Sequence, residues 1–141
     1  MLDTHKHHIS IVTALLLAFV LGSCQKSDTP EASWVKAKGG NVNDVNATIN
    51  DNGETLVHLA VWEGRMDLLT WLKERGADVN VRNKHGQTPI YGAAEYGYVE
   101  ILKWLKEQGA EVNAKSNDGK TPLSVARSDE AKTWLRANGA Q

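Results

Sequence analysis

The side chains that could do chemistry are few in this 141-residue sequence, which has 5 histidines and 1 cysteine. Cys24 alone can form neither an internal disulfide nor a thiolate metal site. Three of the histidines lie within the first eight residues, in a segment that we expect to be removed. His58 and His85 remain, and two histidines are too few ligands for a zinc site. We therefore predict that the protein binds no metal and no cofactor.

The sequence also lacks the motifs that carry common enzyme chemistry. It contains no G-x-S-x-G nucleophile elbow, no glycine-rich phosphate loop and no H-E-x-x-H metal motif. Carboxylates such as Glu95, Asp129 and Glu130 fall on expected helix surfaces, where the pattern indicates no desolvated acid–base pair. We predict that the protein is not an enzyme.

The charge balance excludes a further class of function. The chain has 16 Lys and Arg against 17 Asp and Glu, for a formal net charge of −1. Proteins that bind nucleic acid usually carry a clear basic excess, so we predict no nucleic-acid partner. The length allows one ordinary domain at most.

The N-terminal segment is typical of an export signal. Residues 9–21 form an apolar run in which only Ser10 and Thr13 are polar. A membrane-spanning helix needs about 20 apolar residues, so this run is too short to span and has the length of a signal-peptide core. It ends in Leu-Gly-Ser directly before Cys24, which resembles the lipobox of bacterial lipoproteins. The alternatives are a plain secretory signal, or an N-terminal anchor with an incidental cysteine.

The lipobox resemblance implies a division of the N-terminal region and a location. Residues 1–23 would be a lipoprotein signal peptide, and Cys24 would be lipidated after cleavage. The polar residues 24–32 would form a flexible tether of roughly 15–18 Å. Acyl chains on Cys24 would anchor the exported protein to the bacterial membrane, facing the periplasm. Because Gln25 rather than aspartate follows the cysteine, the resemblance favours the outer membrane if the cell is Gram-negative.

The rest of the chain repeats with a period of 33 residues, which is typical of a stacked solenoid. Residues of one type recur at this spacing in three successive units. The recurring positions are Gly53, Gly86 and Gly119; Thr55, Thr88 and Thr121; and Ala60, Ala93 and Ala126.

These units resemble ankyrin repeats. They match the ankyrin pattern of a glycine turn, a T-P-L-H-x-A start, a helix-stopping glycine, an apolar second helix and a G-A-x-x-N ending, with departures. The starts read TLVHLA, TPIYGA and TPLSVA, so the histidine survives only as His58, and the last unit is three residues shorter. The resemblance implies an all-α solenoid of stacked helix-turn-helix units joined by short β-turn loops. Three ankyrin repeats are expected in residues 50–141, at about 50–82, 83–115 and 116–141. The truncated terminal units favour a monomer.

Several local structures follow from the repeat pattern. Asn80 and Asn113 are predicted to tie each loop to its neighbour, and His58 is predicted to be a structural, hydrogen-bonded side chain. Residues 33–49 are expected to form a degenerate N-terminal cap. This cap is either a helix pair broken at Gly39 and Gly40, which we favour, or one helix followed by a loop shifted by four residues.

The resemblance implies that the protein binds another protein through the concave face, which first helices and turn tips form. Trp62 and Tyr96 fall near the ends of first helices, among acidic and amide groups. The alternative for Trp62 is that it packs beneath the N-terminal cap, whereas Trp71, Trp104 and Trp134 are expected in the core. The predicted partner-binding residues are Trp62, Glu63, Glu95, Tyr96, Asp51, Asn52, Glu54, Lys84, His85, Gln87, Asn117, Asp118 and Lys120.

Two functions are therefore open. The favoured one is a membrane-tethered interaction module of the bacterial cell envelope, whose partner the sequence does not identify. The alternative is a structural or accessory envelope lipoprotein that supports an exported enzyme, for example in stress defence, without a dedicated groove partner. Some periplasmic ankyrin proteins with a similar layout assist an exported enzyme such as catalase.

Overall fold

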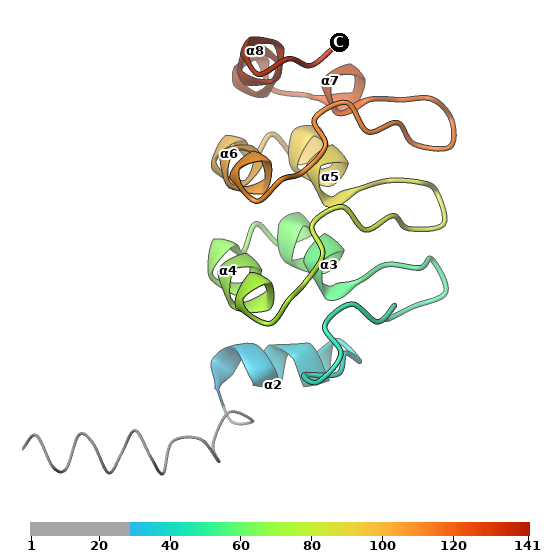
Figure 1. Ribbon diagram of the computed structural model, residues 1–141, viewed down its shortest axis with the longest axis vertical. Helices are drawn as coiled ribbons and strands as arrows, with labels where there is room; N and C mark the ends of the chain where they lie inside the picture. The colour runs from blue at the N-terminus through green and yellow to red at the C-terminus, as the bar shows by residue number, and fades with distance from the viewer. Residues whose placement is uncertain (1–28) are drawn as a thin grey trace, which may run out of the picture.

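A computed structural model of the chain describes residues 29–141, which form seven helices (Figure 1). The predicted signal peptide and Cys24 lie outside the described residues. Among the helices of residues 29–141, none has the length and apolar content needed to cross a bilayer. The helices are α2 (Pro30–Ala37), α3 (Leu56–Trp62), α4 (Met66–Glu74), α5 (Pro89–Tyr96), α6 (Val99–Glu107), α7 (Pro122–Val125) and α8 (Asp129–Ala137).

The helices stack as antiparallel pairs in two columns (Figure 1). The first helices of the pairs, α3, α5 and α7, form one column, and the second helices, α4, α6 and α8, form the other. Long loops project from the side of the first helices, and each loop leads to the next pair. This arrangement confirms the predicted all-α solenoid.

The start of each first helix follows from the threonines that recur every 33 residues. Thr55, Thr88 and Thr121 are N-cap residues with extended backbones. Pro89 and Pro122 occupy the first helical turn, where the missing amide proton is not needed. The threonine positions therefore set the same entry angle for each pair.

Burial of the helix faces explains why the pairs must stack. α4 buries Leu68, Leu69 and Leu72, and α6 buries Leu102 and Leu105 in the same continuous core. A helix pair alone would leave half of this apolar surface in water, so neighbouring pairs cover it.

The three repeated tryptophans of the second helices are less buried than the sequence predicts. Trp71 is 9% exposed, and the guanidinium of Arg75 stacks 3.7 Å from its ring centre. Trp104 and Trp134 are only half-buried against the core. The tryptophans therefore line the edge of the core, not its centre.

Asparagine side chains hold the loops of successive units together. Asn80 donates from Nδ2 to the carbonyl of Gly109 (3.0 Å) and accepts from the amide of Glu111 (2.9 Å). Asn113 makes the equivalent bonds with Gly139 and Gln141, both 2.9 Å. This confirms the predicted role of both asparagines. The sequence analysis missed a third member, Asn46, which bonds in the same way to Gly76 and Asp78.

The N-terminal cap is one helix followed by a loop, so the favoured helix pair is wrong. α2 ends just before Gly39, whose φ of 78° matches that of Gly76 (83°) after α4. The loop that follows carries the turns and the Asn46 bonds typical of the other units. Gly40 lets the start of this loop approach α3 closely, because a Cβ on Gly40 would lie 2.8 Å from the side chain of Leu56.

The boundary of the predicted tether also moves. Thr29 caps α2 by accepting from the amide of Ala32 (3.2 Å), and Pro30 begins the helix. Ala32 is fully buried. Residues 30–32 therefore belong to the domain and not to the flexible segment.

Replacing Asn80 with alanine should lower the free energy of unfolding by about 1–2 kcal/mol, because two hydrogen bonds between repeats are lost. Urea denaturation followed by circular dichroism measures the change. Asn43→Ala is the matched control, since this exposed asparagine makes no side-chain hydrogen bond within the described part of the chain. Equal stability of the two variants would contradict a stabilising role for Asn80.

Candidate functional site

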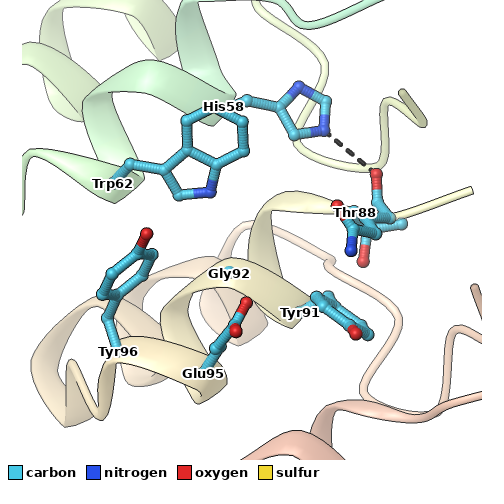
Figure 2. A pocket seen from close by; sticks show the side chains of 8 residues that line it. His58, Trp62, Thr88, Tyr91, Gly92, Glu95 and Tyr96 are labelled. Atoms are coloured by element: carbon cyan, nitrogen blue, oxygen red, sulfur yellow. Dashed lines mark hydrogen bonds between the residues drawn. The ribbon is translucent and has the colours of Figure 1, made fainter. Parts of the chain in front are cut away.

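The concave side carries a small pocket between α3 and α5 (Figure 2). Its volume is about 130 Å³. Pockets that bury small-molecule ligands usually measure about 300–1,000 Å³, so this one has room for a single side chain of a partner. The lining residues are His58, Trp62, Gln87, Thr88, Tyr91, Gly92, Glu95 and Tyr96.

Trp62 forms the α3 wall of the pocket, where its indole lies against α5. A Cβ on Gly92 would lie 2.8 Å from the indole Nε1 and 3.1 Å from Cδ1, so only glycine leaves room for the ring. The indole is half-buried and tilted toward the His58 ring, with 6.1 Å between the ring centres. Trp62 therefore packs toward the second repeat and not beneath the N-terminal cap, which settles the alternative that the sequence left open.

His58 is buried at the back of the pocket and links two repeats. Its Nδ1 accepts from the amide of Thr55 (3.2 Å), so Nε2 carries the proton and donates to the carbonyl of Gln87 (3.1 Å; dashed line in Figure 2). Burial lowers the pKa of His58, although the Gln87 bond and the charge of Glu54 act in the opposite direction. The ring is therefore neutral and structural, as predicted.

Glu95 and Tyr96 form the α5 side of the opening. Tyr96 is 53% exposed and is the one large hydrophobic residue within residues 29–141 that is exposed. Its ring stacks on Tyr98, with 5.8 Å between the centres and an interplanar angle of 17°. Glu95 accepts from Arg127 of the next repeat (2.9 Å). The structure thus brings together four of the predicted residues: Trp62, Gln87, Glu95 and Tyr96.

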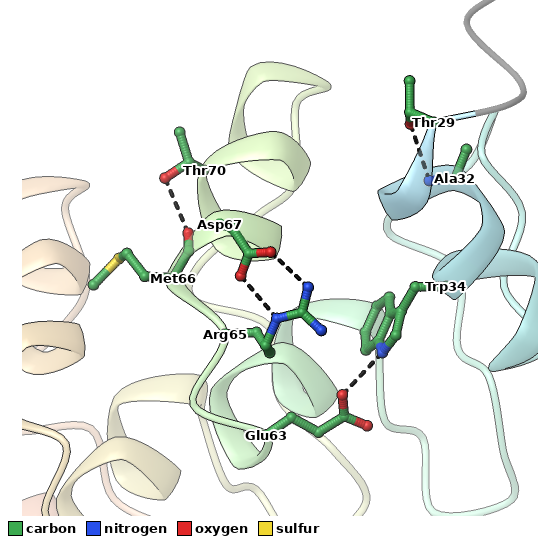
Figure 3. Close-up of polar contacts among 8 residues, drawn as sticks. All are labelled: Thr29, Ala32, Trp34, Glu63, Arg65, Met66, Asp67 and Thr70. Atoms are coloured by element: carbon green, nitrogen blue, oxygen red, sulfur yellow. Dashed lines mark hydrogen bonds and ion pairs between the residues drawn. The ribbon is translucent and has the colours of Figure 1, made fainter.

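Glu63 has a different role from the predicted one, since it holds the N-terminal cap to α3 (Figure 3). The indole Nε1 of Trp34 donates to one carboxylate oxygen (2.9 Å), and Lys38 pairs with the other (2.6 Å). The Lys38 hydrogen bond is the main cause that lowers the pKa of Glu63. Because both oxygens are engaged within the chain, Glu63 is better described as a cap residue than as a partner-binding one.

The same region contains a second charged pair beside the cap. Arg65 donates twice to Asp67, at 2.9 and 2.5 Å (Figure 3). This hydrogen bonding lowers the pKa of Asp67 to about 2. The pair is exposed, so its contribution to stability is small.

Two of the predicted turn-tip residues support the loops from within. Glu54 is only 8% exposed and accepts from the side chains of Asn50 and Asn52. Gln87 is half-buried, and its side-chain oxygen accepts from Asn83 (3.1 Å). The prediction that Glu54 is displayed at a turn tip is therefore wrong, because its carboxylate is turned inward onto Asn50 and Asn52, whereas Gln87 lines the pocket.

The other predicted turn residues lie at the surface, and neighbouring turns are bonded together. The amide of Lys84 donates to the carbonyl of Asn52 (2.8 Å), and Asn117 donates to the carbonyls of Lys84 and His85. Gly86 allows this approach, because a Cβ there would lie 2.3 Å from Asn117 Oδ1. The exposed turn residues are Asp51, Asn52, Lys84, His85, Asn117, Asp118 and Lys120.

The charges of the last turn largely cancel. Asp118 accepts from Ser116, which is the main cause that lowers its pKa, and also pairs with Lys120 at 3.0 Å. The same pair raises the pKa of Lys120. The exposed side chains of this turn therefore offer a partner polar groups but little net charge.

The sequence analysis missed four residues of the site: Thr88, Tyr91, Gly92 and Arg127. The first three line the pocket, and Arg127 reaches it through Glu95. Gly92 could have been identified from the sequence. A glycine in the interior of a helix costs stability and often marks a position where another segment approaches the backbone closely. The other three show no pattern that distinguishes them from ordinary repeat residues.

Metal-binding groups are absent from the described region, where no three His, Cys, Asp or Glu side chains gather closely enough to hold an ion.

The stacked helix pairs, with a pocket between two successive first helices, define a solenoid repeat protein. A family model described as ankyrin repeats (3 copies) matches residues 4–116 and 57–141, so the chain belongs to the ankyrin repeat family. Members of this family are in general protein-interaction modules and not enzymes. No curated protein matches the chain.

The stability of the domain should fall as the pH falls below about 6.5, because unfolded His58 then binds a proton that the folded ring resists. For this one group the slope is at most about 1.4 kcal/mol per pH unit, and the contribution is fully present above pH 6.5. Urea denaturation between pH 5.5 and 7.5 measures the slope. His58→Gln should flatten it, whereas His85→Gln, at an exposed turn, should not. An unchanged slope in His58→Gln would assign the pH dependence to other groups.

Proposed function

We propose that this protein is a membrane-tethered ankyrin module of the bacterial cell envelope that binds another protein through its concave face. The observation that carries the proposal is the aromatic opening between α3 and α5, where Trp62 is half-buried and Tyr96 is 53% exposed. Tryptophan and tyrosine dominate the energetic centres of protein interfaces, because each contributes a large apolar area with little conformational entropy.

The rigidity of this face supports the same proposal. Each turn is bonded to the next through backbone and asparagine contacts, such as the Lys84–Asn52 bond of 2.8 Å. His58 joins the α3 unit to the α5 unit at the back of the pocket. A surface that is already ordered loses less entropy when a partner binds, so it binds more tightly for the same contacts.

The proposed anchor would hold the module close to the membrane. If Cys24 is the lipidated N-terminus, residues 25–28 separate it from Thr29, the cap of α2. Four residues reach at most about 14 Å when fully extended. The partner would therefore be another envelope protein, or the part of one that lies near the headgroups.

Replacing both Trp62 and Tyr96 with alanine should abolish partner capture, because the aromatic opening is then lost. The measurement is chemical cross-linking in the native membranes, followed by affinity purification and mass spectrometry. Recovery of one protein with the wild type, and its loss with the variant, is the expected result.

Trp134→Ala is the matched control, since it removes a half-buried tryptophan from α8, in the other column of helices. It should capture the same protein as the wild type, and circular dichroism should show folded protein in both variants. The proposed binding face would be contradicted if the wild type enriched no protein, or if the wild type and both variants recovered the same protein equally. That result would favour the accessory role without a groove partner.

The anchor has an independent test in Cys24→Ser. Without the thiol, no thioether-linked lipid can form, so the protein should move from the membrane to the soluble fraction on cell fractionation. Metabolic labelling with a clickable fatty acid should label the wild type and not the variant. Labelling that persists in Cys24→Ser would exclude Cys24 as the lipidated residue.

A further inference from the structure

We infer that the pocket between α3 and α5 receives an arginine side chain from an extended segment of the partner, with Glu95 as the carboxylate that binds the guanidinium. This inference rests on the proposed interaction function and specifies the chemistry of the partner. It is carried by four features of the pocket: its charge, an unpaired buried hydroxyl, its aromatic walls and a cation that already touches it.

The pocket carries one negative charge. Of its eight lining residues, Glu95 is the one acidic side chain, and none is a lysine or an arginine. The remaining titratable ring, His58, is held neutral, because Nδ1 accepts from Thr55 and Nε2 donates to Gln87. In Figure 2 the Glu95 carboxylate points from α5 toward the space below the Trp62 indole. The charge therefore favours a cationic side chain.

A buried hydroxyl without a partner lies in the same pocket. Thr88 is 3% exposed, and its Oγ1 has no hydrogen-bond partner. The equivalent Thr55 contacts the ring of His58 (3.2 Å), but the residue three positions after Thr88 is Tyr91, which makes no such bond. Buried polar atoms are almost always paired, and the side chain that carries this oxygen lines the pocket, so a small movement of Thr88 would bring its Oγ1 to a donor bound there. A guanidinium has five N–H donors and can supply it.

The aromatic walls favour arginine over lysine. Trp62 lies on one side of the opening and the Tyr96 ring on the other, with Tyr96 fixed by its stacking on Tyr98. A planar guanidinium stacks flat on aromatic faces and binds a carboxylate with two parallel hydrogen bonds, whereas an ammonium group is attracted to the ring as a point charge and lacks the planar fork. The chain itself contains such a stack, between Arg75 and Trp71 at 3.7 Å.

Arg127 shows that the carboxylate accepts a guanidinium and identifies the group that a partner must displace. It contacts one oxygen of Glu95 at 2.9 Å, and its side chain is 74% exposed. A single exposed ion pair contributes little to stability, so a partner arginine with stacking on both sides would replace it. Arg127 thus competes with the partner for Glu95.

Because Arg127 and the partner's arginine compete for Glu95, substituting Glu95 and substituting Arg127 should change arginine binding in opposite directions. The probe is a nonapeptide of glycine and serine with one central arginine, and its control carries citrulline, which has the same shape without the charge. Binding to the full chain in detergent micelles is followed by NMR through the indole N–H signal of Trp62, assigned with Trp62→Phe. The arginine peptide should shift this signal at about fivefold lower concentration than the citrulline peptide.

Glu95→Gln should remove the preference for arginine, whereas Arg127→Gln should strengthen arginine binding by removing the competitor. If the Glu95–Arg127 ion pair only stabilised the fold, both substitutions would change the affinity for the arginine peptide in the same direction. Equal shifts with the arginine and citrulline peptides, or unchanged binding in Glu95→Gln, would overturn the inference. A partner captured through Trp62 and Tyr96 but unaffected by Glu95→Gln would leave the proposed function standing and exclude the arginine.

Discussion

The structure depends on one constraint: a pair of helices as short as these, with four to nine residues each, cannot bury its own apolar face. Leu68, Leu69 and Leu72 of α4 are buried in one continuous core that residues of α3 and of the neighbouring units complete. Stacking requires a constant register between units, and polar bonds provide it. Asn46, Asn80 and Asn113 each join a loop to the one that follows, and His58 joins α3 to the loop before α5.

The same register creates the candidate site. No single unit contains the pocket, because Trp62 comes from α3 and Glu95 and Tyr96 come from α5, one repeat later. Gly92 determines how closely they meet, since its missing side chain admits the indole. The contacts that stabilise the stack and the contacts that shape the groove are therefore largely shared. A change that shifts one pair relative to the next would alter both stability and recognition.

The chain belongs to the ankyrin family, whose members are in general interaction modules, and the pocket between α3 and α5 adds geometry that the family does not specify. The charges of the turn tips are partly cancelled by pairs such as Asp118 with Lys120. Other features lie deeper, where Glu95, Thr88 and two aromatic rings line one small space and the one charge is held only by the exposed Arg127. Specificity in this reading comes from a pocket in the groove, and the turns contribute shape and polar contacts around it.

The sequence by itself determined the repeat period, the threonine caps, the asparagine contacts of Asn80 and Asn113 and the structural role of His58, because these residues belong to a motif that recurs at a fixed spacing and so meets its neighbour in the same register. Only the tertiary structure decided the arrangement of the N-terminal cap, the engagement of Glu63 by Trp34 and Lys38, the burial of Glu54 and the pocket itself. Most of these are contacts between side chains about 30 residues apart in neighbouring units. Their geometry depends on the distance between two stacked helices, and no spacing along one chain segment encodes that distance.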